Sequence, residues 1–301
     1  MDLISCIGNT PLISFKVPNI KAKLEMTNPG GSVKDRIALA IIKEAKARGA
    51  LKPGGVVIEA TSGNTGLGLA MVAAALDIKM KICMPSSMSM ERRALLRFLG
   101  AELILTKPEL GMQGAVDKAQ ELLEKTPNAI CANQFENEAN VKAHYENTGP
   151  EIWRQSEGLV DFLVLTVGTG GTLTGTGTYL REKNPKLKII AVEPFESPLL
   201  SQGKAGPHGI QGIGANFVPK ILRRELIDEV MTISTKEAID TARELAILEG
   251  LMVGISSGAA FCAAKRVALA NPGKKIITLL PDTAARYLST GLFADLAADL
   301  V

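Results

Sequence analysis

The chain of 301 residues has room for about two domains of roughly 150 residues each. Its 34 Lys and Arg residues nearly balance its 31 Asp and Glu residues, for a formal net charge of +3. With one Trp, three Tyr and eight Phe it has few base-stacking side chains, so nucleic acid is not expected as its main partner. The longest uncharged apolar run, 66–76, is shorter than the roughly 18 residues of a membrane span, and the N-terminus shows no secretory signal, which predicts a soluble protein.

The cysteines lie far apart, each in an apolar stretch, and form no C-x-x-C pair: Cys6, Cys83, Cys131 and Cys262. The only histidines are His144 and His208, too few for a zinc cluster, and neither is placed in sequence to activate a thiol or serine. We therefore expect buried, unreactive thiols and a reducing compartment, the cytoplasm.

The first predicted element in chain order is an edge hairpin, with strands at 12–17 and 21–26 joined by 18–20. Short β-branched runs then alternate with segments of helical period. Strands are expected at 56–60, 79–84, 101–106, 129–132, 162–167, 187–193, 229–233 and 274–280. The helices between them include 33–48, 90–99, 111–125, 236–249 and 259–270. This alternation favours an α/β fold of doubly wound parallel sheets covered by helices on both faces.

The polar, Asn-rich segment 136–150 interrupts the alternation, and we expect a boundary between two α/β units near it. In such folds ligands bind at the carboxyl ends of the strands. The loops that follow the strands are therefore where chemistry is expected.

The glycine-rich loop 168–172 (GTGGT) follows one strand and opens a helix, which predicts a phosphate site. A plain tight turn is the alternative. A dinucleotide fingerprint would need glycine at Leu173, and the chain contains no G-x-x-x-x-G-K-[ST] motif. The pattern therefore favours a single phosphate.

The loop 61–66 (TSGNTG) carries hydroxyl and amide groups at another helix start, as a carboxylate-binding loop would. Helix capping by Thr61 or Ser62 is the alternative.

Lys34 is expected in the first turn of a helix opened by a capping box of Ser32 and Asp35, where the dipole disfavours a protonated amine. That favours an imine-forming or proton-abstracting lysine, although a solvated side chain would give the same pattern.

The combination of a phosphate loop, such a lysine and a carboxylate loop suggests pyridoxal phosphate acting on an amino acid. The chain closely resembles, nearly from end to end, the cysteine synthases (O-acetylserine sulfhydrylases), which are fold type II pyridoxal-phosphate enzymes. The segments that carry the resemblance are 8–12 (GNTPL), 32–36 (SVKDR), 61–66 (TSGNTG), 148–153 (TGPEIW), 168–172 (GTGGT), 206–208 (GPH), 210–214 (IQGIG), 254–258 (GISSG) and 286–290 (RYLST). The resemblance implies two tryptophan synthase β-like domains with the cofactor between them, a smaller mobile one at 34–140 and a larger one formed by 1–33 and 141–301.

The resemblance also implies the residue roles. Lys34 would form the internal aldimine and act as the base at the substrate Cα, and Ser256 would face the pyridine nitrogen. Asn64 would bind the ring hydroxyl. The cofactor phosphate would be held by Gly168, Thr169, Gly170, Gly171 and Thr172, and the substrate carboxylate by Thr61, Ser62, Gly63, Thr65 and Gln134.

The implied reaction is β-replacement, in which O-acetyl-L-serine loses acetate to give an aminoacrylate and sulfide adds to give L-cysteine. The family further implies a homodimer that accepts the C-terminal tail of serine acetyltransferase. Gly209 stands where the family has lysine, Asn216 where it has glycine, and 281–285 replaces a Ser-Gly-Glu stretch. These departures leave open a cysteine-consuming, sulfide-releasing enzyme (a desulfhydrase or lanthionine synthase) or a serine-using cystathionine β-synthase. A non-catalytic binding protein on the same fold is a further alternative.

Overall fold

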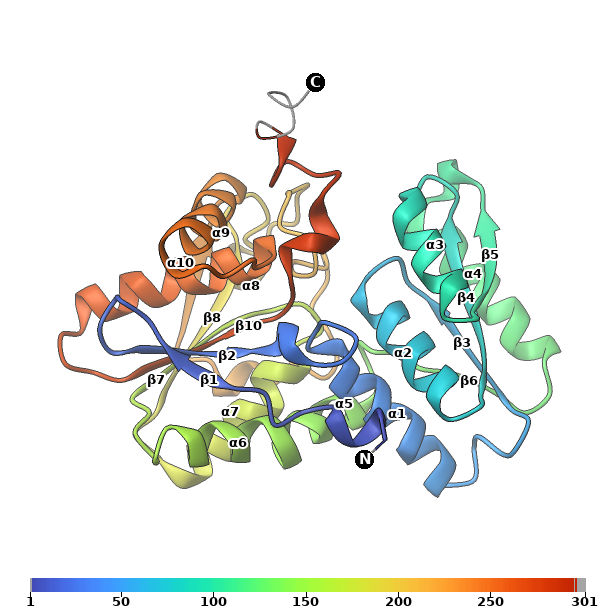
Figure 1. The fold of residues 1–301 in the computed structure, drawn as a ribbon, viewed down its shortest axis with the longest axis horizontal. Helices are drawn as coiled ribbons and strands as arrows, with labels where there is room; N and C mark the ends of the chain where they lie inside the picture. The colour runs from blue at the N-terminus through green and yellow to red at the C-terminus, as the bar shows by residue number, and fades with distance from the viewer. Residues whose placement is uncertain (1, 295, 297–301) are drawn as a thin grey trace. The chain divides into compact units, whose positions relative to one another are not determined.

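A computed structural model describes residues 2–294 and 296 of the chain. The described residues divide into two compact units (Figure 1). The first unit is formed by 1–7 and 34–140, and the second by 8–33 and 141–301, in each case as far as the residues are described. Each unit has its own sheet. Two sheets with helices alternating along the chain confirm the predicted α/β class.

The first unit contains a parallel sheet of four strands in the order β5-β4-β3-β6. Its strands are β3 (Val56–Ala60), β4 (Lys79–Pro85), β5 (Glu102–Thr106) and β6 (Ala129–Cys131). Its helices are α1 (Lys34–Ala47), α2 (Asn64–Ala75), α3 (Met90–Phe98) and α4 (Gly111–Lys125), and the chain leaves the unit within α5 (Glu138–Ala143). Val56 and Ile58 of β3 share a buried cluster with Ala115 and Ala119 of α4.

The second unit contains a sheet of six strands in the order β1-β2-β10-β7-β8-β9, parallel except for the antiparallel edge strand β1. Its strands are β1 (Leu12–Ser14), β2 (Ile20–Leu24), β7 (Phe162–Thr166), β8 (Lys188–Pro194), β9 (Glu229–Ile233) and β10 (Ile276–Leu280). Its helices are α6 (Gly149–Gln155), α7 (Gly171–Lys183), α8 (Leu199–Gln202), α9 (Thr235–Glu249) and α10 (Ile255–Ala270), and a π-helical turn, η4 (His144–Thr148), precedes α6.

Side-chain alternation in the central strands of this sheet builds two cores. Val164 packs with residues of α9 and α10 on one face, while Leu163 and Leu165 pack with residues of α6 and α7 on the other. The same two helix pairs cover opposite faces of the sheet in Figure 1. Because both faces are covered, β7 is apolar at nearly every position, as a doubly wound sheet requires.

Most predicted elements lie within one or two residues of the observed ones, which is the usual uncertainty of strand and helix ends. The edge hairpin is present but shorter, since β1 ends at Ser14. The helix expected at 259–270 begins earlier, at Ile255. Among the described residues, no helix is long and apolar enough to cross a membrane.

The expectation that all four cysteines are buried was wrong. Cys83 is buried, but Cys6 and Cys131 are exposed and Cys262 is half-buried. Cys131 ends β6, an edge strand of its sheet, so its apolar neighbours in sequence do not enclose it. Burial raises the pKa of the Cys83 thiol to about 11, so this thiol is protonated at neutral pH.

Candidate active site

The glycine loop lies at the carboxyl end of β7 and leads directly into α7. A Cβ at Gly168 would lie 2.3 Å from the carbonyl oxygen of Gly212, so a side chain cannot be placed there without moving backbone. Gly170 is the N-cap residue of α7 and has a left-handed backbone (φ 83°). A Cβ at that position would also lie 2.7 Å from Leu222 Cβ. Both glycines are therefore required by the shape of the loop.

The loop presents uncharged hydrogen-bond donors at a helix N-terminus. The first-turn N–H groups of an α-helix have no intrahelical acceptors and carry the positive end of the dipole. The Gly171 N–H lies 3.4 Å from the Thr169 hydroxyl oxygen, and Thr169 is buried. The Thr172 hydroxyl contributes a further polar group in the first turn of α7. This set matches what a phosphate monoester needs.

A second loop of the same unit starts α10, where Gly254 is the N-cap residue and no side chain caps the helix. Ser256 lies in the first turn and is 3% exposed. The Gly254 N–H donates to the Asp282 carbonyl oxygen (3.1 Å), and the Tyr287 hydroxyl donates to the Asp282 carboxylate (2.5 Å). Asp282 follows β10, which pairs with β7 in parallel, so its loop lies at the same edge of the sheet as the glycine loop.

In the first unit, the loop 61–63 follows β3, and α2 begins at Asn64. Gly63 is the N-cap residue and no side chain caps this helix, so neither Thr61 nor Ser62 has the capping role that the sequence left open. The Thr61 hydroxyl oxygen instead accepts the Gly63 N–H (3.2 Å), and the Ser62 carbonyl oxygen accepts from Arg92 (3.2 Å).

Gln134 lies beside this loop, as its predicted role requires. It follows β6, the strand that pairs with β3. The Thr65 hydroxyl donates to Gln134 Oε1 (2.5 Å), and Asn140 Nδ2 donates to the Gln134 carbonyl oxygen (2.8 Å). The Thr65 contact fixes Oε1 as an acceptor, and the amide nitrogen of Gln134 is the group that can donate to an anionic ligand.

Glu59 is a buried residue of this loop cluster that the sequence reasoning missed. Its carboxylate accepts the Asn133 N–H (3.0 Å) and lies 3.4 Å from the Cys131 thiol. Burial raises the pKa of Glu59 to about 7. Although Cys131 as a residue is exposed, desolvation of its thiol and the nearby Glu59 carboxylate raise the thiol pKa to about 12. A lone acid inside an apolar strand was the available signal in the sequence.

Lys34 is the first residue of α1, within one residue of the predicted start. Its carbonyl oxygen would lie 3.1 Å from a Cβ at Gly68 of α2, so the glycine permits close packing of α1 on α2. The preceding residue, Val33, belongs to the second unit and donates its N–H to the Pro281 carbonyl oxygen (2.9 Å). Within the first unit the structure thus places Lys34 at one helix start and Thr61 to Thr65, with Gln134, at another.

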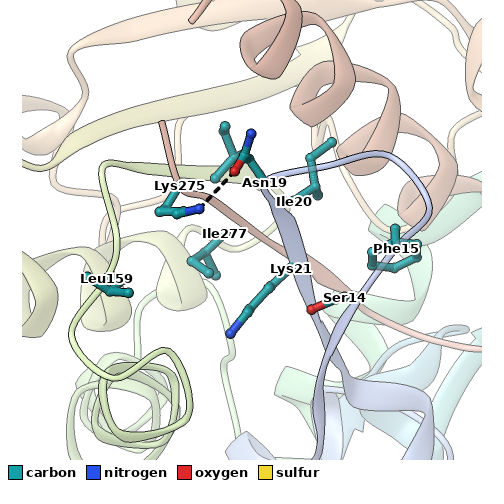
Figure 2. A pocket seen from close by; sticks show the side chains of 9 residues that line it. Ser14, Phe15, Asn19, Ile20, Lys21, Leu159, Lys275 and Ile277 are labelled. Atoms are coloured by element: carbon teal, nitrogen blue, oxygen red, sulfur yellow. Dashed lines mark hydrogen bonds between the residues drawn. The ribbon is translucent and has the colours of Figure 1, made fainter. Parts of the chain in front are cut away.

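A pocket of about 230 Å³ in the second unit lies elsewhere (Figure 2). Ile20 and Lys21 of β2 and Ile276 and Ile277 of β10 line it, and all four lie at the amino ends of their strands. Lys275 Nζ donates to Asn19 Oδ1 there (2.8 Å). The glycine loop follows the carboxyl end of β7, so this pocket is separate from the candidate site.

Comparison with known proteins places the chain in a family. Residues 3–282 match the model of the pyridoxal-phosphate-dependent enzyme family. The chain is 53% identical over 290 residues to cysteine synthase B of Campylobacter jejuni, covering 96% of this chain and 97% of that protein. Its structure is similar to that of O-acetylserine sulfhydrylase isoform 3 from Entamoeba histolytica, with a TM-score of 0.94, 44% identity, and coverage of 97% and 91%.

A hydrogen sulfide-producing enzyme from Fusobacterium nucleatum is also similar, with a TM-score of 0.90, 44% identity, and coverage of 95% of this chain and 99% of that one. The chain belongs to the pyridoxal-phosphate-dependent enzymes and has the fold of their fold type II members. Within that family, its resemblance to the cysteine synthases is confirmed. Pyridoxal phosphate is accordingly its cofactor.

The residues present fit that cofactor. The phosphate loop offers backbone and hydroxyl donors at the start of α7, and its two constrained glycines keep side chains out of the loop. At the start of α10, the Ser257 hydroxyl is buried and has no hydrogen-bond partner among residues 2–294 and 296, next to the almost fully buried Ser256. Neutral donors of this kind suit a phosphate and a ring nitrogen without adding charge.

Proposed function

We propose that this enzyme makes L-cysteine from O-acetyl-L-serine and sulfide by β-replacement. The observation that carries the proposal is the pairing of Thr65 with Gln134 beside the loop 61–63, because it holds the Gln134 amide, a neutral donor for the carboxylate of a small amino acid, next to that loop. The similarity to cysteine synthase B of Campylobacter jejuni supports this choice of substrates.

When bound, pyridoxal phosphate supplies an electron sink for proton loss at the substrate Cα and departure of the β-substituent. We assign its phosphate to Gly168, Thr169, Gly170, Gly171 and Thr172, its ring nitrogen to Ser256, and its ring hydroxyl to Asn64. These donors are uncharged, so Ser256 stabilises an unprotonated ring nitrogen. That favours elimination over chemistry that needs a long-lived carbanion.

Lys34 is assigned two tasks, covalent attachment of the cofactor and transfer of the Cα proton. Its position at the start of α1 supports the second task, because the helix dipole disfavours a protonated amine there. Lys34 removes the proton before acetate leaves and returns it after sulfide has added at Cβ. The same residue then serves as base and acid, which keeps the proton within one site.

The substrate carboxylate is assigned to Thr61, Ser62, Gly63, Thr65 and Gln134. Thr65 acts through Gln134, since its hydroxyl donates to Oε1 and leaves the amide nitrogen as the donor for the carboxylate. We also propose that 34–140 moves as the smaller domain and excludes water when the carboxylate binds. A decrease in the radius of gyration on adding O-acetylserine, measured by solution scattering, would support that motion.

The oligomeric state, the partner and the compartment are also proposed from the family resemblance. We propose a homodimer that works in the cytoplasm and that binds the C-terminal tail of serine acetyltransferase. Light scattering of the purified protein tests the dimer. Competition between a peptide of that tail and O-acetylserine tests the partner, and an absence of competition would remove it.

Sulfide release from cysteine is the second candidate activity, and the similar hydrogen sulfide-producing enzyme of Fusobacterium nucleatum favours it. Asn216 has a left-handed backbone (φ 61°), a conformation that asparagine tolerates and glycine favours. The Ser197 hydroxyl donates to its Oδ1 (2.8 Å). Asn216 therefore preserves the backbone that glycine would adopt, so this departure from the family pattern does not by itself require a different substrate.

The departure at Gly209 is more constrained. A Cβ there would lie 2.5 Å from Thr235 Cγ2, so the lysine found in the family would require Thr235 to move. The Gly209 N–H donates to the Thr235 hydroxyl (2.9 Å). These contacts of Gly209 are with Thr235, and they assign Gly209 no part in the chemistry at Lys34.

Replacement of Lys34 by Ala tests the proposed function. Lys34→Ala should still bind pyridoxal phosphate noncovalently but lose the visible band of a lysine-bound cofactor and lose cysteine formation. The wild-type protein assayed beside it should form cysteine from O-acetylserine faster than it releases sulfide from cysteine. Turnover in Lys34→Ala like that of the wild type, or faster sulfide release by the wild type, would overturn the proposal.

A further inference from the structure

The N-terminal half of α7 packs closely against the end of α5 and the π-helical turn η4. A Cβ at Gly175 of α7 would lie 2.2 Å from the Val141 carbonyl oxygen and 2.8 Å from His144 Cβ, so only glycine allows this approach. π-Helical turns are rare and frequently occur at functional sites. The turn brings His144, which the proposed reaction does not use, next to the phosphate loop.

His144 is 1% exposed, and both ring nitrogens face threonine hydroxyls. Its Nδ1 lies 2.9 Å from Thr148 Oγ1, and its Nε2 lies 3.2 Å from Thr172 Oγ1. Thr148 is also fully buried. The buried ring therefore connects one hydroxyl with no access to water to the hydroxyl of Thr172 in the phosphate loop.

The direction of the two hydrogen bonds decides what Thr172 can do. A neutral imidazole has one donor nitrogen and one acceptor nitrogen. If Nε2 accepted, the Thr172 proton would point at the ring and only lone pairs would face the phosphate. If Nε2–H donates, Thr172 Oγ1 is the acceptor and its own proton is free to donate to the phosphate.

We propose that His144 is a positioning residue that adopts the Nε2–H tautomer and thereby directs the Thr172 hydroxyl proton to the cofactor phosphate. In this arrangement the Thr148 hydroxyl, which can donate or accept, donates to Nδ1. The inference rests on the proposed function, since it takes Thr172 as a phosphate ligand. It adds a chain of oriented hydrogen bonds from Thr148 through His144 to the phosphate.

The affinity test compares pyridoxal phosphate with pyridoxal, which lacks the phosphate. His144→Phe keeps a ring but removes both hydrogen bonds, and His144→Gln retains an N–H donor near the position of Nε2. The cofactor is first removed from each protein. Losing one oriented hydrogen bond to the anion should then weaken the binding of pyridoxal phosphate to His144→Phe by about tenfold. Pyridoxal affinity should stay unchanged, and His144→Gln should recover most of the loss.

Tyr145→Phe is the matched control. It removes one hydrogen bond from the same π turn, on the exposed side, where the Tyr145 hydroxyl donates to Glu182 (2.9 Å). This variant should bind both compounds as the wild type does. A parallel loss of pyridoxal phosphate and pyridoxal affinity in His144→Phe, or no rescue by His144→Gln, would overturn the inference. If the wild type bound no pyridoxal phosphate, the proposed function would fail instead.

Nitrogen-15 NMR of histidine-labelled wild-type holoenzyme reports the tautomer of His144 directly, without an affinity measurement. The chain has two histidines, and comparison with His144→Gln assigns their signals. His208 serves as an internal reference, because its Nε2 faces the Gly214 carbonyl oxygen (2.9 Å), which can only accept. His144 should show a protonated Nε2 and an unprotonated Nδ1. A protonated Nδ1 would contradict the proposal.

Discussion

Glu59 offers a quantitative test of the buried polar cluster beneath the proposed carboxylate loop. Glu59 as a residue is 5% exposed, and its carboxylate has the Asn133 N–H and the Cys131 thiol as partners. Replacement by Gln keeps the volume and an acceptor for the Asn133 N–H but removes the ionisation. The variant Glu59→Gln therefore isolates the cost of burying the charge.

Burial raises the pKa of Glu59 from 4.5 to about 7, which fixes the sign of the effect. Between these values the folded protein holds a proton that the unfolded chain has released, so the free energy of unfolding falls as pH rises through this window. A pKa difference of that size between the folded and unfolded states changes the free energy of unfolding by about 3 kcal/mol at most. The decrease in the free energy of unfolding should be complete above the pKa of Glu59 in the folded protein. Glu59→Gln has no group that ionises at this position and should not show the decrease.

The assay is urea unfolding of both proteins at pH 5 and pH 8. The free energy of unfolding of Glu59→Gln relative to the wild type should rise by about 2–3 kcal/mol from the lower to the higher pH, because a small part of the effect is already lost at pH 5. Other titrating groups cancel in this comparison because the two proteins share them. A difference that stays constant between these pH values would refute a buried, protonatable Glu59.

Three further predictions concern the loops and the framework. Gly170→Ala should destabilise the protein by at least about 1–3 kcal/mol, because its left-handed backbone and the nearby Leu222 both oppose a side chain, and thermal unfolding would check it. Thr65→Val should raise KM for O-acetylserine about tenfold while leaving the cofactor spectrum unchanged, and an unchanged KM would count against the Gln134 role. Lys23→Met should cost about 3–5 kcal/mol in urea unfolding, since it removes the ammonium group that lies 2.7 Å from the buried Glu151 carboxylate; a loss below about 1 kcal/mol would contradict this.

Elements with a complete hydrophobic period were predictable from the sequence. β3 and β9 have the predicted bounds, and α1 begins within one residue of its predicted start. These elements were predictable because strand alternation and helix periodicity are local properties. The first turn of α10 was not predicted as helix, because 255–258 has the serine and glycine composition of a loop. Tertiary burial, with Ser256 and Ser257 almost inaccessible, overrides that local preference.

The candidate site likewise has parts that were predictable from the sequence and parts that were not. The glycine loop and the loop 61–66 could be found because composition alone marks them. The family resemblance assigned both Thr65 and Gln134 to the substrate carboxylate, but the hydrogen bond between them was not predicted, since the two residues follow different strands. Glu59 and His144 were missed because their significance depends on what packs around them, and single buried side chains leave little trace in composition.

This enzyme uses pyridoxal phosphate to exchange the acetyloxy group of O-acetylserine for sulfide. The most direct measurement is the visible absorption spectrum of the purified protein, taken before and after adding O-acetylserine and then sulfide, with the cysteine formed measured at the end. We predict a cofactor band that shifts with O-acetylserine and returns with sulfide as one equivalent of cysteine appears per site. A cofactor band that does not respond to O-acetylserine would contradict the account.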